Sequence, residues 1–216
     1  MTLTLLHTSP VHIPVFDALR DVDHPGLDLR HVVREELLVR AGVEGPAAVT
    51  DEVRSLLEDA ARDGADAVLC TCSSIGAVAE GLADTVGVPV LRVDRPMAAR
   101  AVAAGSRITV VATVRSTFGP TVALVEEEAE RAGRAVDVRT VFVDGAWERF
   151  LAGDRDGYLD LVALALDGIA GADAIVLAQA SLTDAADRTG TGIPVLSSPR
   201  PGLDAAAAEY ARARTA

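Results

Sequence analysis

GADAVLCTCSSIG, residues 64–76, is the stretch of sequence that decides the fold. The apolar run at 67–72 follows Gly64 and ends at Ser73-Ser74, which is typical of a short strand buried on both faces of a sheet. The residues after it predict a helix over about 75–86 and a further strand at 89–93. Strand, helix and strand in this order predict a parallel sheet with a right-handed crossover.

The same scheme returns about one hundred residues later. GADAIVLAQASLT, residues 171–183, resembles the first stretch, and V-P-V at 88–90 has its counterpart in I-P-V at 193–195. A repeat of this length indicates duplication of a whole lobe rather than a solenoid. The sequence therefore predicts an α/β protein with two pseudo-symmetric lobes, each a mainly parallel sheet flanked by helices, and a ligand site in the cleft between them.

The remaining segments fit two such lobes. Further strands are expected at 2–7, 27–33, 107–113, 136–143, 173–178 and 193–196, and further helices up to about 21 and at 46–64, 118–132, 156–170 and 201–214. The break near Arg95-Pro96 predicts an N-terminal lobe of 1–96 plus 197–216 and a C-terminal lobe of 97–196. The final helix is expected to pack on the first lobe.

Composition excludes several classes of function. The formal net charge of −12 makes nucleic acid an unfavourable partner, because a phosphate backbone is repelled by an acidic surface. No apolar run approaches 18 residues without charges or helix breakers, so we expect no membrane span. The N-terminus lacks the pattern of a secretory signal, and only two cysteines are present. We therefore expect a cytoplasmic protein.

The two cysteines differ in the role that their positions predict. Cys70 lies inside the buried strand and is expected to be structural. Cys72 stands at the strand end before a helix, where a helix N-terminus favours the thiolate. A metal or redox pair is the weaker interpretation, because no further cysteine or Cys/His cluster accompanies the CxC spacing.

Hydroxyl-rich turns follow four predicted strands, at Thr8-Ser9, Cys72 to Ser74, Thr113 to Thr117, and Gln179 to Ser181. Ser and Thr at such positions either cap the next helix or bind a carboxylate at its N–H groups. Four such turns converging on one cleft favour a ligand. The candidate carboxylate donors are Ser9, Ser73, Ser74, Thr113, Ser116, Thr117 and Ser181. His12 is a further candidate, His7 a weaker one, and Arg115 a candidate clamp. Arg95 and Arg200, each before a proline in similar turns, are expected at the rim of the site, and the run Glu126-Glu127-Glu128 is expected on a solvated helix face.

These residues resemble the two signatures of the aspartate/glutamate racemase superfamily. GADAVLCTCSS matches an alanine-rich strand ending in Cys-Asn-Thr, with Cys72 on the cysteine and Ser73-Ser74 after it. GADAIVLAQAS matches the strand ending in Gly-Cys-Thr, with Gln179 on the second cysteine. The resemblance implies proton transfer alpha to a carboxylate without pyridoxal phosphate or metal. It implies a small carboxylic-acid or amino-acid substrate, and a homodimer as the common arrangement in the family.

Gln179 changes what the resemblance implies. Racemases of this type use one thiol on each face of the carbon, but an amide does not titrate at neutral pH. Another group can serve the second face, with His7, His12, Glu36 and Asp144 as candidates. A one-base isomerase, a one-thiol decarboxylase or a protein that binds without turnover are the other options.

The leading hypothesis is a racemase or related isomerase with Cys72 as acid/base. Gln179 then completes the catalytic pair by orienting the substrate or polarising an oxygen. A non-catalytic binder of small carboxylates is the rival from another class, and a flavodoxin-like redox module is a third, weaker idea. The substrate and the oligomeric state stay open at this point.

Overall fold

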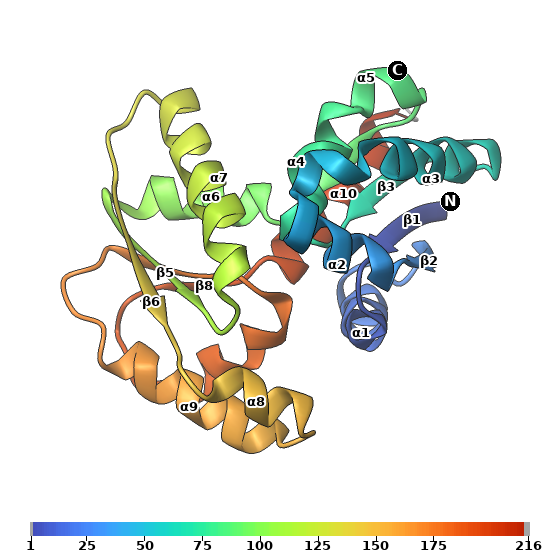
Figure 1. Cartoon of the computed structure of the whole chain (residues 1–216). Coiled ribbons are helices and arrows are strands. Elements are labelled where there is room, and N and C mark those ends of the chain that lie inside the picture. Colours follow the sequence, from blue (N-terminus) through green and yellow to red (C-terminus); the bar gives the residue numbers. More distant parts are fainter. Residues whose placement is uncertain (1, 214–216) are drawn as a thin grey trace. The chain divides into compact units, whose positions relative to one another are not determined.

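The computed structural model describes residues 2–213 and divides them into two compact units. The first contains Met1–Asp94 and Pro199–Ala216, and the second contains Arg95–Ser198. Each unit holds one four-stranded sheet in which all neighbouring strands are parallel (Figure 1). The predicted α/β class with two sheets flanked by helices is thus confirmed. The lobe limits of 1–96 plus 197–216 and 97–196, taken as domains, stay a prediction.

The elements of the first unit, in chain order, are β1 (Thr2–His7), η1 (Pro10–His12), α1 (Ile13–Asp23), β2 (Asp28–Val33), α2 (Glu35–Glu44), η2 (Pro46–Val49), α3 (Thr50–Arg62), β3 (Ala67–Cys70), α4 (Ser73–Gly81), α5 (Ala83–Val86), β4 (Val90–Arg92) and α10 (Pro199–Ala213). The strand order is β2-β1-β3-β4. This order brings the ends of β1 and β3 side by side, with Leu6 paired to Cys70.

The second unit repeats this topology with the order β6-β5-β7-β8. Its elements are α6 (Arg95–Ala104), β5 (Arg107–Ala112), η3 (Arg115–Thr117), α7 (Phe118–Arg131), β6 (Asp137–Phe142), α8 (Ala146–Leu151), α9 (Arg155–Asp167), β7 (Ala174–Leu177), η4 (Ala180–Asp187) and β8 (Val195–Leu196). Here Val111 pairs with Leu177, as Leu6 pairs with Cys70 in the first unit.

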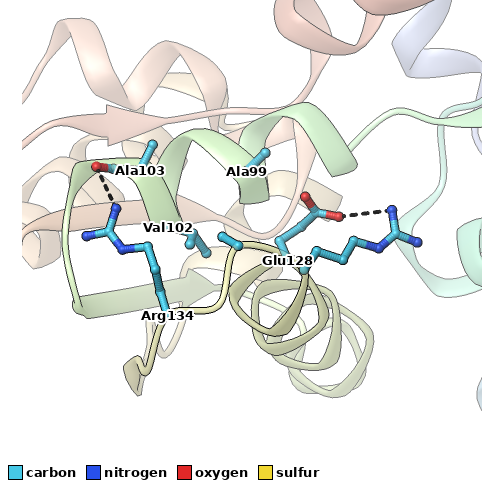
Figure 2. Close-up of a pocket in the computed structure, with 7 residues that line it drawn as sticks. Ala99, Val102, Ala103, Glu128 and Arg134 are labelled. Carbon is cyan, nitrogen blue, oxygen red and sulfur yellow. Dashed lines mark hydrogen bonds and ion pairs between the residues drawn. The ribbon is translucent and has the colours of Figure 1, made fainter.

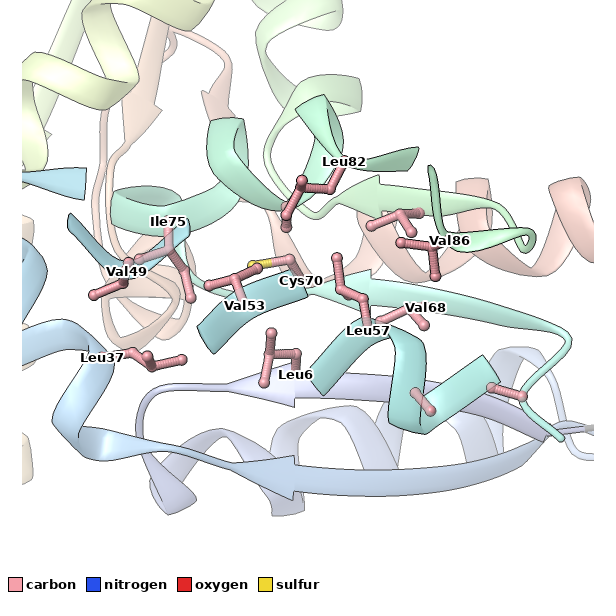
Figure 3. Packing of buried hydrophobic residues seen from close by; sticks show 14 of the residues in the cluster. Leu6, Leu37, Val49, Val53, Leu57, Val68, Cys70, Ile75, Leu82 and Val86 are labelled. Atoms are coloured by element: carbon pink, nitrogen blue, oxygen red, sulfur yellow. The ribbon is translucent and has the colours of Figure 1, made fainter. Parts of the chain in front are cut away.

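Alternating side chains of each central strand fill two cores, because successive residues of a strand point to opposite faces. In the first unit, Cys70 packs with residues of α2 to α5 on one face (Figure 3). Leu69 packs on the other face with Phe16 of α1 and Leu203 of α10. In the second unit, α6 and α7 cover one face of the sheet, and α8 and α9 cover the other. Each unit is therefore a three-layer α/β/α sandwich.

Several helix predictions were wrong in detail. Neither α2 nor α6 is among the helices predicted from the sequence. In α2 only Leu37 and Ala41 are buried, so the segment lacks the broad apolar stripe that marks a helix. Arg95-Pro96 was interpreted as a break and Arg200-Pro201 as a turn, but both pairs begin helices. Proline is tolerated in the first helical turn, where its missing N–H would have no intrahelical partner.

The boundaries around the candidate site also differ from the prediction. The strand expected over 67–72 ends at Cys70, and the helix expected from 75 begins at Ser73. The segment after Gln179 forms a 3-10 helix, and the strand expected over 193–196 is confined to Val195–Leu196. Cys72 therefore lies in the short connection between strand and helix rather than within the strand.

Candidate active site

Cys72 occupies the residue immediately before α4. Its backbone is extended, with φ −111° and ψ 118°, and its side chain is partly buried without capping the helix. The N-terminal amides of α4 lack intrahelical partners and carry a partial positive charge, which favours the anionic form of a nearby thiol. Cys72 thus has the exposure and the setting that a reactive thiol needs.

Cys70 is the inert member of the pair. Its side chain is fully buried, and its thiol donates to the carbonyl oxygen of Cys72 at 3.7 Å. Burial raises the pKa of Cys70 far above its ordinary value, and the nearby thiol of Cys72 raises it further. The prediction of a structural Cys70 is confirmed, so Cys72 is the thiol on which acid/base chemistry can rest.

The other predicted donors of the first unit belong to the same edge of the sheet. Ser73 and Ser74 are partly buried and open α4, while Ser9 precedes η1 in extended conformation. Ser9 makes no capping hydrogen bond with its side chain. Because β1 and β3 are parallel neighbours, the Ser9 turn and the Cys72 turn both follow the carboxyl ends of paired strands. His12 ends η1, and desolvation lowers its pKa.

Gln179 holds the corresponding position in the second unit, one residue before η4. Its side-chain oxygen accepts from the backbone N–H of Thr113 at 2.8 Å and of Val114 at 3.1 Å. The hydroxyl of Thr113 donates to the same oxygen at 3.0 Å. A backbone N–H can only donate, so these bonds identify the oxygen of the amide and set its orientation. The Gln179 NH₂ group is therefore the end that can face a ligand.

The remaining hydroxyls of this edge have distinct roles. Thr113 is buried and supports Gln179, and the hydroxyl of Thr117 donates to Val114 O at 2.7 Å within its own turn. Ser116 is exposed on η3. Ser181 is partly buried, and its hydroxyl lies 2.8 Å from the Tyr158 hydroxyl. The hydroxyl of Thr117 thus binds a backbone oxygen, that of Thr113 binds the Gln179 side chain, and that of Ser181 lies beside Tyr158.

Several side chains considered from the sequence make contacts outside the candidate site. The guanidinium of Arg115 stacks on the Phe142 ring at 3.9 Å. Glu36 is exposed on α2. Glu128 was assigned to a solvated helix face, which is wrong because its side chain is only 12% exposed and pairs with Arg95. Arg95, expected at the rim of a turn, makes this pair from the first turn of α6.

A pocket of about 320 Å³ lies between α6 and α7, away from the carboxyl edge of the sheet. Its lining includes Ala99, Val102, Glu128 and Arg134 (Figure 2). Arg134 donates to the carbonyl of Ala103, and Arg131 pairs with Glu128 at 3.5 Å. The polar groups of this pocket thus already bind one another, and none of the predicted site residues lines it.

Residues 2–213 contain neither a metal-binding cluster nor a membrane-spanning helix. No group of three or more His, Cys, Asp or Glu side chains in this range is arranged to hold a metal ion. None of the helices in the same range is long and apolar enough to cross a membrane.

A family profile decides where the chain belongs. The profile of Asp/Glu/hydantoin racemases matches residues 15–209. The chain is a member of the Asp/Glu/hydantoin racemase family. The match includes Cys72 and Gln179, whereas β1 and the Ser9 turn precede it. No curated protein matches the chain in sequence.

Solved structures show the same fold as this racemase-family chain. A glutamate racemase from Bacillus anthracis superposes with a TM-score of 0.73 at 15% identity, covering 98% of this chain and 82% of the other. Allantoin racemase from Pseudomonas fluorescens gives 0.62 at 21% identity, covering 99% and 92%. Arylmalonate decarboxylase gives 0.63 at 18% identity, covering 97% and 92%. At these identities the likeness establishes the fold alone.

Two side chains of the family member, Tyr158 and Thr71, were missed from the sequence as parts of the site's surroundings. Tyr158 of α9 is buried and lies between Ser181 and Thr113, with its hydroxyl 3.5 Å from that of Thr113. His7 and Thr71 are buried at the ends of β1 and β3, where Thr71 Oγ1 lies 2.8 Å from His7 Nδ1. The sequence separation of 64 residues gives no local signal for this last pair.

The buried His7 predicts a pH dependence of stability. Burial, together with the nearby imidazoles of His31 and His12, lowers the pKa of His7 from 6.5 to about 3. Below pH 6.5 the unfolded chain binds a proton at His7 that the folded chain does not bind until about pH 3. As the pH is lowered from 6.5 to about 3, the free energy of unfolding should therefore decrease. The contribution of this group is at most about 1.4 kcal/mol per pH unit.

Urea denaturation at intervals from pH 7 to pH 4 measures this slope. The variant His7→Phe keeps a ring of similar size without a titrating group, so its unfolding free energy should depend less steeply on pH. Equal slopes in the two proteins would contradict a neutral, buried His7.

Proposed function

We propose that this chain is a cofactor-independent enzyme that transfers a proton at a carbon alpha to a carboxylate, with Cys72 as its single acid/base. Membership of a family of racemases supports the reaction class. Within the described chain the cysteines are Cys70 and Cys72, and burial keeps Cys70 out of the chemistry. The proposal therefore assigns proton transfer to one thiol.

The chemistry requires strong stabilisation of charge beside the carbon. A Cα–H next to a carboxylate is very weakly acidic, and its removal places a second negative charge on the carboxylate oxygens. Directed hydrogen-bond donors in a site that excludes water lower this cost. The free amides at the start of α4 and the hydroxyls of Ser73, Ser74 and Ser9 are the candidates in the first unit. They would hold the carboxylate while the Cys72 sulfur lies about 3–3.5 Å from the carbon.

The orientation of Gln179 is the observation that carries the one-thiol assignment. Its oxygen is occupied by Thr113 and Val114, so the group that it offers to a ligand is an NH₂ donor. An amide N–H stabilises an oxyanion but neither removes nor supplies a proton at neutral pH. Gln179 would thus replace the second thiol of a two-thiol racemase by a fixed donor. That Gln179 and Cys72 serve one site stays a prediction.

A one-thiol decarboxylase is the second candidate, and the same observation favours it. Loss of carbon dioxide from a malonate-type substrate leaves an enediolate that needs only one proton, delivered to one face. The Cys72 thiol supplies this proton to carbon, and the resulting thiolate regains a proton from water. A fixed donor such as the Gln179 amide suits this reaction, since no second proton-transfer group is required.

Isotope exchange in heavy water distinguishes the candidates. Single enantiomers of small α-substituted carboxylic and amino acids, and α-substituted malonates, are incubated with the protein. Deuterium at Cα with loss of optical purity supports racemisation. Carbon dioxide release with one deuterium of fixed configuration supports decarboxylation. A ligand that protects Cys72 from alkylation but exchanges no deuterium and releases no carbon dioxide identifies a binding protein and contradicts the proposal.

The variant Gln179→Glu tests the donor role of Gln179. A glutamate at 179 still accepts hydrogen bonds from Thr113 and Val114, so the turn keeps its support. Its second oxygen replaces the NH₂ group by an acceptor that repels a carboxylate. A hydrogen bond to a charged group is worth about 1.5–3 kcal/mol. The KM of the wild-type substrate should therefore rise about 10- to 100-fold, as measured by steady-state kinetics.

Ser116→Ala provides a control on the same edge. Ser116 is exposed and none of the hydrogen bonds around Gln179 involves it, so a change of less than about twofold in KM would assign it no role in binding. An unchanged KM in Gln179→Glu would contradict a donor role for Gln179.

A further inference from the structure

Four side chains from different segments form a continuous hydrogen-bonded chain in the first unit. Thr71, just after β3, lies with its Oγ1 2.8 Å from Nδ1 of His7 at the end of β1. His7 Nε2 lies 2.8 Å from Nδ1 of His31 on β2. His31 Nε2 lies 3.3 Å from Oδ1 of Asp17 on α1. We call these four residues the histidine chain.

The carboxylate fixes the direction of every proton in this chain while both imidazoles are neutral. Asp17 accepts only, so His31 Nε2–H donates to it and His31 Nδ1 is left to accept. His7 Nε2–H then donates to His31, and His7 Nδ1 accepts from the Thr71 hydroxyl, whose proton it shares with Leu6 O at 3.1 Å. Every ring nitrogen has one partner and one role. The order leaves the Thr71 hydroxyl bound to His7 rather than free to rotate.

The rings are held in place as firmly as their protons. His7 is 0% exposed, and its ring meets that of His31 edge to edge, with ring centroids 5.1 Å apart and planes 19° from parallel. Phe16 packs on the other side of His7, at 5.7 Å between centroids. Buried polar groups that are fully satisfied rigidify their surroundings. The histidine chain therefore fixes the ends of β1 and β3 relative to each other.

The ends of β1 and β3 both lead directly into the candidate site. Thr71 is bonded covalently to Cys72, and its backbone N–H and its hydroxyl both lie within hydrogen-bonding distance of Leu6 O, at 3.0 and 3.1 Å. His7 stands two residues before Ser9. The backbone segment that carries the thiol is thus attached to the segment that carries Ser9, a predicted carboxylate donor.

The second unit shows that the fold does not need the histidine chain. Ala178 N donates to Val111 O at 3.0 Å, as Thr71 N donates to Leu6 O. This match places Ala178 at the position of Thr71 and Ala112 at the position of His7. Thr140, paired with Val110, corresponds to His31, which pairs with Leu5. The repeated topology packs with two alanines and a threonine, so the histidine chain distinguishes the unit that carries the thiol.

We infer that Thr71, His7, His31 and Asp17 are positioning residues for Cys72, and that they hold its sulfur and backbone in the geometry for proton transfer. This role rests on the proposed function of Cys72. It explains why buried polar side chains occur where the other unit has small ones. It also assigns Asp17, 41% exposed at its side chain, a part in a site that it does not touch.

The variant Thr71→Ala tests this inference, because it introduces the residue that the second unit carries at the same position. Thr71→Ser restores the hydroxyl and serves as the conservative rescue. Thr4→Ala is the matched control, since Thr4 is a buried threonine of β1 whose hydroxyl has no partner among the described residues. Asp17→Asn weakens the outer end at a partly exposed position and remains informative if Thr71→Ala fails to fold.

Two readouts separate positioning from mere stability. We expect Thr71→Ala to lower kcat about 10- to 100-fold with little change in KM, because small misplacements of a reacting group are costly. The rate at which iodoacetamide alkylates Cys72, followed from pH 6 to pH 10, should shift its midpoint in Thr71→Ala. Asp17→Asn should shift it in the same direction, whereas Thr71→Ser and Thr4→Ala should match the wild type.

Two results would overturn the inference. A folded Thr71→Ala with a lower melting temperature but unchanged kcat and alkylation profile would give the histidine chain a purely structural role. An alkylation profile of Asp17→Asn that matches the wild type would show that Asp17 and His31 have no part in positioning Cys72. The alkylation readout needs no substrate, so it keeps the inference testable if Cys72→Ala retains turnover and the proposed function itself fails.

Discussion

Replacement of Cys72 by alanine should reduce turnover of the natural substrate by about 10²- to 10⁴-fold, the range that a positioned general acid or base contributes. The protein should remain folded, because Cys72 is only partly buried and makes no side-chain cap to α4. Residual activity would come from the hydrogen-bond donors that still bind the carboxylate. Steady-state kinetics together with deuterium exchange at Cα measure the loss.

Cys70→Ala is the matched control for this prediction. Cys70 packs against Leu6, Val53 and Ile75 in the core cluster (Figure 3). Its truncation leaves a small cavity and should cost about 1 kcal/mol of stability, with kcat close to that of the wild type. Full turnover in Cys72→Ala would remove the thiol from the chemistry, whatever Cys70→Ala does.

Gly202→Ala should destabilise the first unit by about 1–3 kcal/mol, through overpacking between α10 and the end of β4. A Cβ at Gly202 would lie 2.5 Å from both the carbonyl oxygen and Cγ2 of Val93, and 2.9 Å from its Cα. Two of these atoms belong to the backbone, so a rotamer change alone cannot relieve the contact. The helix would have to move away from the sheet face that it covers with Leu203. Urea denaturation measures the change.

The control variant for Gly202→Ala is Gly42→Ala on α2. A Cβ at Gly42 would meet nothing within 4 Å, and the residue is exposed within a helix. Alanine should stabilise this helix by about 0.5–1 kcal/mol, because it loses less backbone entropy on folding than glycine does. A loss of stability in Gly42→Ala as large as that in Gly202→Ala would show that the effect does not come from the α10 contact.

Sequence patterns located the strands better than the helices. The buried strands around Leu69 and Val176 are continuous apolar runs, which few other structures produce. Helices α2 and α6 escaped prediction, because the first exposes apolar residues such as Val39 and Val43 and the second begins with Arg-Pro. The carboxyl group of Glu128 was placed in solvent, because its pairing with Arg95 joins residues 33 apart in the sequence.

For the candidate site, too, some features follow from the local sequence and others do not. That Cys72 precedes a helix, and that Gln179 occupies the matching turn of the repeat, follows from local sequence. That Gln179 presents an NH₂ group does not, because its oxygen is fixed by amides 65 and 66 residues away. Tyr158 likewise joins the surroundings of Ser181 through a contact spanning 23 residues.

The amino-acid sequence by itself determined the two parallel sheets, the duplication and the position of the thiol at a strand end. These properties depend on hydrophobic runs and turn residues within a dozen positions of one another. Only the tertiary structure decided which polar atoms meet at the two edges: the fixed amide of Gln179 and the chain from Asp17 to Thr71. Such hydrogen bonds join strands that become neighbours only when the sheet forms, so their partners follow from topology and register rather than from any local pattern.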